Sequence, residues 1–333
     1  MNQGPEGELA RAVAALRAGE LVAFPTETVY GLGADARNPQ AVAKIFAAKG
    51  RPADHPLIVH LARADSLPAW ARELPPAAEK LAAAFWPGPL TMILKRARGV
   101  PDAVTGGQDT VGLRVPDHPL ALELLAAFAG DNHGGLAAPS ANRFGRISPT
   151  TAAHVRAELG NAISMVLDGG PCAVGIESTI IDLSRGTPAL LRPGAISAAQ
   201  LAQVLGSEVA DAAAAGADRP RVPGSLAAHY APATPLQQVP GEILVEAAAQ
   251  AQARGQRVAV LARRATAELS EGLLWQQAPL DLAGYAHELY ASLRRLDAAG
   301  CDLILVETVP SAWSAVADRL SRAAQGAGGD EET

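Results

Sequence analysis

The sequence predicts an α/β fold with a mixed sheet, followed by a second and smaller α/β unit. Over the first two thirds of the 333-residue chain, helical patterns of apolar residues alternate with short extended runs. The connections between these runs vary in length, which favours a sheet with both parallel and antiparallel strands. Residues 207–235 are rich in Ala, Gly and Pro and precede a shorter α/β pattern, which predicts two domains joined by a linker.

The N-terminal part of the chain predicts a helix followed by a strand. Leu9, Val13 and Leu16 recur at the spacing of one helical face, and Gly19 is placed where it can end the helix. Residues 21–24 form a short apolar run, which predicts a strand. This order of helix and strand begins the α/β pattern.

A second predicted helix carries the first pair of candidate functional residues. Asn38 is a typical N-cap, Pro39 suits the first helical position, and Gly50 suits a left-handed residue at the helix end. Lys49 and Arg51 therefore flank a helix C-terminus. Such a pair is often only a solvated helix end. Two cations on either side of a glycine could also bind a compact anion, because glycine lets the backbone approach a ligand closely. Phosphate is the first candidate for this anion.

The remaining elements follow from apolar runs and helical periodicity. Strands are predicted at residues 57–61, 90–94, 111–115, 136–138, 164–167, 178–183 and 189–191, and helices at 76–85, 120–128 and 151–159. After the linker, strands at 257–261 and 303–306 and helices at 285–299 and 312–324 predict a βαβα-type unit. We therefore expect a first domain at residues 1–206, a linker at 207–235, a second domain at 236–325 and a disordered tail at 326–333.

Composition and charge restrict the class of protein. Apolar residues make up 49% of the chain and charged residues 19%, which is typical of a globular protein with a substantial core. The net charge of −6 disfavours a broad basic surface for nucleic acid. Cys172 and Cys301 have no Cys-x-x-Cys partner, which fits a reducing compartment and excludes a disulfide framework. No apolar run has membrane-spanning length and residues 1–8 do not resemble a signal peptide, so we expect a cytoplasmic protein without membrane contact.

Several well-known catalytic motifs are absent or incomplete. No Walker A sequence occurs, and residues 31–36 match a dinucleotide fingerprint only formally because the next helix begins later, at Pro39. A glycine turn that lets the backbone pass close to another group is the preferred interpretation. Ser140 lacks the Gly-x-Ser-x-Gly elbow of a nucleophile and is better interpreted as a ligand-binding group. His55 and His60 lack the spacing of a metal site, so binding or packing roles remain.

Polar side chains collect at the ends of the predicted strands, where α/β folds usually present ligand sites. Thr110 and Arg114 are four residues apart and therefore share one face of a strand, although Arg114 could equally be a surface cation. Asn142 precedes a hydroxyl-rich turn that is also typical of a helix N-cap. Glycine, hydroxyl groups and cations recur at residues 175–179 and 191–194. Together these clusters predict one site built from many segments.

Motifs spread over residues 8–235 identify a family. They are PTETVYGLG (25–33), KGRP (49–52), PLIVH (56–60), WPGPLT (86–91), RVPDHP (114–119), APSAN (138–142) and EST (177–179). In these motifs, and in their order, the chain resembles the Sua5/YrdC/YwlC family, and more closely its two-domain Sua5-type L-threonylcarbamoyladenylate synthases. The resemblance implies a YrdC-like twisted mixed sheet with flanking helices and a smaller C-terminal Rossmann-like αβα domain.

The same resemblance implies a nucleotidyltransferase. It would make threonylcarbamoyl-AMP and pyrophosphate from L-threonine, bicarbonate and ATP, and a tRNA threonylcarbamoyltransferase complex would receive the product for tRNA threonylcarbamoyladenosine modification. Mg²⁺ would accompany ATP, held mainly by the nucleotide phosphates rather than by a protein metal site. Direct tRNA binding stays open. The alternatives are a double-stranded RNA or nucleotide-binding module, which the acidic charge disfavours, and a sugar-phosphate lyase of related fold, which would need an acidic metal site.

The resemblance also implies functions for individual residues. The catalytic group would consist of Lys49, Arg51, Ser140 and Asn142. Threonine would be surrounded by Thr28, His60, Arg114, Ala138 and Ser178, with the planar fork of Arg114 on the carboxylate and only backbone groups from Ala138. ATP would contact Arg51, His55, Thr110, Ser140, Ser148, Arg192 and Tyr230, although the family often has Asn in place of His55.

Tyr230 lies within the predicted linker, and the resemblance implies that this segment covers the catalytic pocket. Such a cover would exclude water from a labile acyl adenylate and could gate product release. Deletion of residues 223–232 is therefore expected to impair formation or retention of the adenylate, and unchanged pyrophosphate release with an unchanged product lifetime would contradict it.

Overall fold

The structure is a computed structural model that describes residues 5–211, 216, 219–265 and 271–327. The chain divides into two compact units. The first comprises residues up to 144 together with 149–173 and 177–225. The second comprises residues 145–148, 174–176 and those from 226 onwards, so two short loops from the first part of the sequence belong to the second unit.

The first unit is built on a nine-stranded sheet in the order β7-β1-β2-β6-β3-β5-β4-β8-β9. Its strands are β1 (Val22–Phe24), β2 (Gly31–Asp35), β3 (Ile58–Leu61), β4 (Leu90–Lys95), β5 (Thr110–Arg114), β6 (Gly135–Ala137), β7 (Met165–Val166), β8 (Thr179–Asp182) and β9 (Ala189–Arg192). β3 pairs with β5 in parallel and with β6 antiparallel, and β4 likewise has one neighbour of each kind. The predicted mixed sheet is therefore confirmed.

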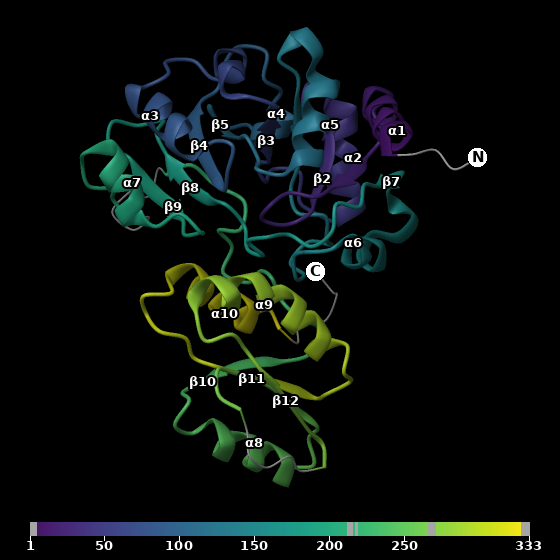
Figure 1. Ribbon diagram of the computed structural model, residues 1–333, viewed down its shortest axis with the longest axis vertical. Coiled ribbons are helices and arrows are strands. Elements are labelled where there is room, and N and C mark those ends of the chain that lie inside the picture. The colour runs from purple at the N-terminus through teal and green to yellow at the C-terminus, as the bar shows by residue number, and fades with distance from the viewer. Residues whose placement is uncertain (1–4, 212–215, 217–218, 266–270, 328–333) are drawn as a thin grey trace. The chain divides into compact units, whose positions relative to one another are not determined.

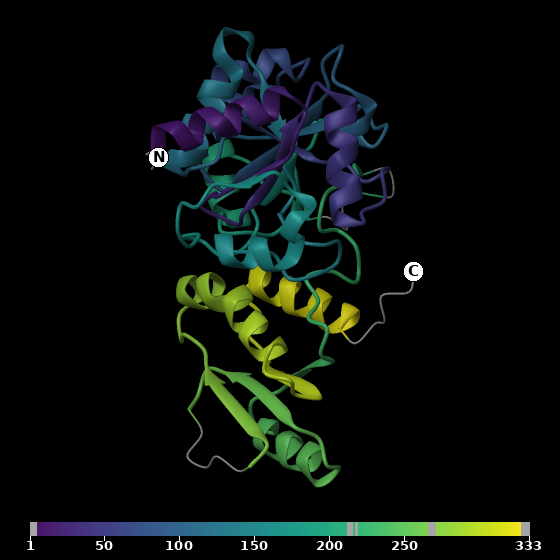
Figure 2. The same ribbon diagram turned by 90° about the vertical axis from the view of Figure 1, so that its right-hand side faces the viewer.

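Helices cover both faces of this sheet (Figures 1 and 2). They are α1 (Pro5–Arg17), α2 (Pro39–Lys49), α3 (Pro76–Phe85), α4 (Asp102–Thr105), α5 (Pro119–Ala129), α6 (Ala152–Leu159) and α7 (Ala198–Leu205), with short 3₁₀ turns at η1 (Ala64–Ala69), η2 (Gly130–Asn132) and η3 (Gly160–Ala162). α1 and α5 pack through Leu16 and Leu124 against Phe24 on one face, while α2 packs through Ile45 into the core on the other. Both faces of the central strands are therefore buried, as their nearly continuous apolar runs require.

Helix α2 has the ends that the sequence predicts. The side chain of Asn38 accepts hydrogen bonds from the backbone N–H groups of Gln40 and Ala41, and Pro39 is the first helical residue. Gly50 ends the helix with a φ of 63°, a left-handed conformation that glycine adopts without steric cost. This end fixes the positions of Lys49 and Arg51 on either side of Gly50.

The glycine turn expected at residues 31–36 is wrong, because residues 31–35 form strand β2, which pairs antiparallel with β1. A Cβ atom on Gly33 would lie only 2.8 Å from Cε1 of Phe24, and one on Gly31 would lie 3.3 Å from Cβ of Ala138. The glycines therefore serve close side-chain packing against a strand, not a turn. Helix α7 was not predicted either, although its Ser197–Gln200 capping box is a recognisable start.

The second unit contains a four-stranded parallel sheet in the order β10-β13-β11-β12. Its elements are β10 (Leu236–Val239), α8 (Leu244–Ala253), β11 (Val258–Ala262), β12 (Leu273–Gln277), α9 (Leu282–Asp297), β13 (Leu303–Glu307) and α10 (Ser314–Gly326). Helix α8 covers one face of the sheet, and α9 and α10 cover the other (Figure 1). The predicted βαβα pattern was incomplete, because it lacked β10, α8 and β12.

Most of the predicted tail and part of the predicted linker lie outside the residues that the structure describes. Helix α10 continues to Gly326, where the predicted tail begins, and residues 328–333 lie outside the described residues. Within the predicted linker, residues 212–215 and 217–218 also lie outside them. Across the described ranges, no helix combines the length and the apolar character needed to cross a membrane.

Candidate functional site

The C-terminal end of helix α2 is hydrogen-bonded to the loop that carries Ser140 and Asn142. The Nζ atom of Lys49 donates a hydrogen bond to the carbonyl oxygen of Ser140 at 2.6 Å and another to that of Asn142. Lys49 is only 3% exposed. Burial, and secondarily the positive charge of Arg51, hold the pKa of Lys49 well below its usual value. The structure thus brings three of the predicted catalytic residues together, with Lys49 holding the loop by its backbone.

Arg51 is buried on the other side of Gly50. Its Nη2 atom donates to the carbonyl oxygen of Pro56 at 2.9 Å, and its guanidinium lies 5.8 Å from the ring centroid of Phe144. The imidazole of His55 packs edge-on against the same ring, with centroids 5.4 Å apart. Burial, and then the charge of Arg51, lower the pKa of His55. His55 therefore lies beside the cationic group as a predominantly neutral imidazole at neutral pH.

Arg114, at the end of β5, forms a buried ion pair with Glu27. Its Nη2 atom lies 2.7 Å from Oε2 of Glu27, and the two side chains are only 5% and 8% exposed. The Nε atom of Arg114 also donates to the carbonyl oxygen of Gly88 at 3.3 Å. The guanidinium is therefore fixed in place and partly neutralised, which leaves Nη1 as the part of the fork not used by these two contacts.

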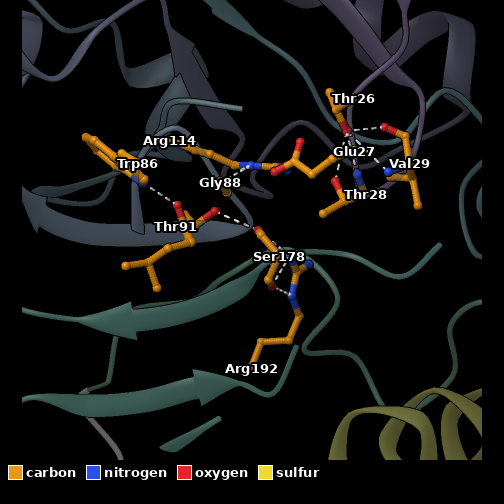
Figure 3. A network of polar contacts seen from close by, with 11 residues as sticks. Thr26, Glu27, Thr28, Val29, Trp86, Gly88, Thr91, Arg114, Ser178 and Arg192 are labelled. Atoms are coloured by element: carbon orange, nitrogen blue, oxygen red, sulfur yellow. Dashed lines mark hydrogen bonds and ion pairs between the residues drawn. The ribbon is translucent and has the colours of Figure 1, made fainter. Parts of the chain in front are cut away.

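Thr28 follows Glu27 in a tight loop that is held together by the side-chain hydroxyl group of Thr26. The Oγ1 of Thr26 donates to the carbonyl oxygen of Val29 at 2.6 Å and accepts from the backbone N–H groups of Thr28 and Val29. The hydroxyl oxygens of Thr26 and Thr28 are 2.9 Å apart. Figure 3 shows this loop, Arg114 and Ser178 converging from separate segments of the chain.

The side chain of Ser178 is hydrogen-bonded to one residue of strand β4 and one residue of strand β9. Its Oγ atom lies 2.7 Å from Oγ1 of Thr91 in β4, and Nη2 of Arg192 donates to it at 3.2 Å (Figure 3). Arg192 also donates through Nε and Nη2 to the carbonyl oxygen of Ser178, and through Nη1 to that of Pro223. Ser178 and Arg192, predicted for different substrates, are thus in direct contact.

His60 lies beside Arg114, because β3 and β5 are parallel with these two residues in register. Burial is the main cause that lowers the pKa of His60 to about 3, and the neighbouring Arg114 cation lowers it further. His60 is 3% exposed, and its ring packs edge-on against that of Phe24. The imidazole is therefore neutral in the folded protein at physiological pH.

The buried neutral His60 predicts that acid destabilises the first unit. Between about pH 6.5 and pH 3 the unfolded chain binds a proton that the folded chain does not, so the free energy of unfolding falls as the pH falls, by up to about 1.4 kcal/mol per pH unit. Above pH 6.5 both states are neutral and the effect is absent. The measurement is chemical denaturation of the native protein and of His60→Gln between pH 7.5 and 5. The variant should show the shallower dependence, and parallel curves would contradict the prediction.

The remaining predicted residues of the first unit lie at nearby strand ends. Ala138 uses its backbone N–H in a hydrogen bond to the carbonyl oxygen of Ile58, which leaves its carbonyl group to offer. Thr110 begins β5 opposite Lys95. Ser140 forms a backbone bridge with Gly31 and is partly buried.

Ser148 and Tyr230 belong to the second unit. Tyr230 is 1% exposed and has a φ of 61°, an unusual conformation for a residue other than glycine. Its ring lies 5.7 Å from that of Tyr290, and the guanidinium of Arg319 lies 5.4 Å from its centroid. Ser148 is fully buried. The predicted contact of both residues with ATP stays a prediction.

Two residues of this network were not predicted from the sequence. Glu27 forms an ion pair with Arg114, and Thr91 forms a hydrogen bond with Ser178. Both lie inside motifs that carried the family resemblance, PTETVYGLG and WPGPLT. Their position within those motifs was therefore a signal, but their partners are distant in sequence and became visible only in the folded chain.

The arrangement suits a ligand that carries both negative charge and oxygen acceptors. Four cations, Lys49, Arg51, Arg114 and Arg192, are buried in one unit, and each makes hydrogen bonds that orient it. The hydroxyl groups of Thr28 and Ser178 are buried in the same unit, and that of Ser178 contacts Arg192. Preorganised cations in a poorly hydrated site stabilise developing phosphate charge, and an arginine fork suits a carboxylate.

Comparison with known proteins identifies relatives over nearly the whole chain. A family model described as "Telomere recombination" (Sua5_yciO_yrdC) matches residues 14–194, and one described as "Threonylcarbamoyl-AMP synthase, C-terminal domain" matches residues 196–325. The chain is 40% identical over 318 residues to the threonylcarbamoyl-AMP synthase of Pyrococcus abyssi, covering 92% of this chain and 91% of the relative. It is also 40% identical over 333 residues to that of Bacillus subtilis, covering 96% and 93%.

A solved structure resembles both units. The crystal structure of P. abyssi Sua5 complexed with L-threonine superposes with a TM-score of 0.88 at 38% sequence identity, covering 98% of this chain and 96% of that chain. The similarity therefore extends over the whole fold, not only over the first unit.

Proposed function

Because this chain belongs to the Sua5/YciO/YrdC family of threonylcarbamoyl-AMP synthases, we propose that it joins L-threonine, bicarbonate and ATP into threonylcarbamoyl-AMP, with release of pyrophosphate. The observation that carries the proposal is 40% identity over nearly the whole chain to two proteins of that name. The relative of known structure that holds L-threonine adds support.

The proposed reaction has two steps, carbamate formation and transfer of the adenylyl group. The amine of threonine attacks the carbon of bicarbonate and forms a carbamate with loss of water. A carbamate oxygen then attacks the α-phosphorus of ATP, the bond to the bridging α–β oxygen breaks, and pyrophosphate leaves. Because no covalent protein intermediate is needed, the protein contributes mainly the positions of the reactants and neutralisation of their charge.

The geometry suggests how the residues share this work. Arg51 and Lys49 supply positive charge for the triphosphate, and Lys49 also fixes the loop of Ser140 and Asn142 through its backbone carbonyls. Arg114 is oriented by Glu27 and offers the rest of its fork to the carboxylate of threonine. Buried donors of this kind make binding of a neutral analogue unfavourable, because they would be left unpaired.

Mg²⁺ is proposed to enter with ATP. Within the described ranges, no group of three or more His, Cys, Asp and Glu side chains is arranged to hold a metal ion. The site residues named above are cations, amides and hydroxyl groups, which suit the phosphates rather than the metal. Mg²⁺ would neutralise phosphate charge from the nucleotide side.

The product is proposed to pass to a tRNA threonylcarbamoyltransferase in the cytoplasm. Threonylcarbamoyl-AMP is a mixed anhydride that water hydrolyses, so a transferase that accepts it soon after release is the chemical partner expected.

The test is reconstitution with purified components. The protein is incubated with ATP, Mg²⁺, bicarbonate and labelled L-threonine, and both pyrophosphate and threonylcarbamoyl-AMP are measured. We expect the two products in equal amounts and only when threonine and bicarbonate are both present. Pyrophosphate release that depends on neither would overturn the proposal.

A further inference from the structure

The contact between Thr91 and Ser178 determines which way the Ser178 hydroxyl can act. Thr91 is fully buried in β4, and its Oγ1 lies 2.7 Å from Oγ of Ser178. Arg192 approaches the same Oγ atom with Nη2 at 3.2 Å. Ser178 is itself 1% exposed, so neither contact is open to bulk water.

The donors and acceptors of these groups can be counted. A hydroxyl group has one proton to donate and two lone pairs to accept with, whereas a guanidinium only donates. The Arg192 contact therefore occupies one lone pair of Ser178 Oγ. In the part of the chain that the structure describes, Ser178 Oγ is the only hydrogen-bond partner of the Thr91 hydroxyl.

Whichever of the two hydroxyl groups donates, the proton of the other has no protein acceptor within the described ranges, and leaving it unpaired costs least where a ligand can accept it. Thr91 is fully buried within β4, whereas Ser178 lies in the loop before β8, where the residues predicted to bind threonine converge (Figure 3). Thr91 therefore donates to Ser178 and occupies its second lone pair. The proton of Ser178 then has no protein acceptor among the described residues and is directed to a ligand.

We infer that Thr91 is a positioning residue that makes Ser178 an obligate hydrogen-bond donor to an oxygen atom of the bound amino acid. This inference rests on the proposed function, which identifies that amino acid as threonine. It deepens that function, because a Ser178 whose lone pairs are both occupied rejects a ligand that presents only a donor at this point.

The test removes the Thr91 hydroxyl without changing the size of the side chain. Thr91→Val should weaken L-threonine binding roughly three- to tenfold, measured by calorimetry with a non-hydrolysable ATP analogue present, because the Ser178 hydroxyl loses its fixed direction. The KM for threonine should rise by a similar factor, and the KM for ATP should change less than twofold. Thr91→Ser, which keeps the hydroxyl, should restore affinity to within about twofold of the native protein.

A double-mutant cycle separates positioning from general stability. In a Ser178→Ala background, Thr91→Val should cause no further loss of threonine affinity, because Thr91 acts only through Ser178. Thr105→Val is the matched control, since Thr105 is 1% exposed and bonds Arg96 and the Asp102 carbonyl. It should lower the melting temperature without changing threonine affinity.

Each result decides for or against the inference. Native threonine affinity in Thr91→Val, equal losses in Thr91→Val and Thr91→Ser, or additive losses with Ser178→Ala would overturn it. A native protein that binds threonine but forms no adenylate would defeat the proposed synthase and leave this inference standing. A native protein that does not bind threonine would overturn both.

Discussion

Replacing Arg51 by alanine is expected to lower turnover about 100- to 1,000-fold while the fold persists. Arg51 is 8% exposed, and its guanidinium is fixed by the Pro56 carbonyl group and lies over the ring of Phe144. A preorganised cation of this kind stabilises charge that develops on the phosphates, and water cannot replace it in a buried site. The measurement is pyrophosphate release under saturating ATP and threonine, together with a circular dichroism spectrum of the variant.

Two further variants define what Arg51 contributes. Arg51→Lys keeps the charge but not the planar fork, so we expect activity between those of the native protein and Arg51→Ala. Arg63→Ala is the surface control, because the Arg63 side chain is 57% exposed and pairs with Asp65 at 2.7 Å. It should leave turnover unchanged. Turnover near the native value in Arg51→Ala would refute a catalytic role for this cation.

Local sequence signals predicted much of the first unit. Helix α2 illustrates why, since Asn38, Pro39 and Gly50 determine its ends through contacts within a few residues of each other. Strand β2 shows where such signals fail. Gly31 and Gly33 suit a turn by their local preference, and only the positions of Ala138 and Phe24 explain why glycine is needed in a strand.

The second unit was harder to predict because its outer strands carry little pattern. β12 is an edge strand of the described sheet, next to β11, and its residues are partly or fully exposed. β10 is the other edge and contains Gln237 and Gln238. Without a buried face on each strand, the alternation that identifies strands from sequence is weak.

The candidate site was predictable by residue type but not by partner. The cations and hydroxyl groups could be selected because their motifs resemble those of one family, and that family is now shown. The pairing of Arg114 with Glu27 and of Ser178 with Thr91 joins residues 87 apart in both cases, as the numbering of each pair shows. Such pairs depend on strand order in the sheet, which no local pattern contains.

Removal of Arg114 alone is expected to destabilise the first unit by about 3–5 kcal/mol. Arg114→Met would leave the carboxylate of Glu27 buried without a cation, since that side chain is 8% exposed and its partner lies at 2.7 Å. Glu27→Gln would leave the guanidinium unneutralised, with a smaller cost because the amide oxygen can still accept a hydrogen bond. Urea denaturation of each variant measures these losses.

The double variant Glu27→Gln/Arg114→Met separates the structural role of the pair from its binding role. Neither unpaired charge remains in it, so we expect it to recover most of the stability that Arg114→Met loses, and therefore a favourable coupling in the cycle. Threonine affinity should not recover, because the proposed carboxylate partner is still missing. Stability losses that simply add would show that the ion pair is not coupled. Native threonine affinity in the double variant would remove Arg114 from the binding site and leave it a purely structural cation.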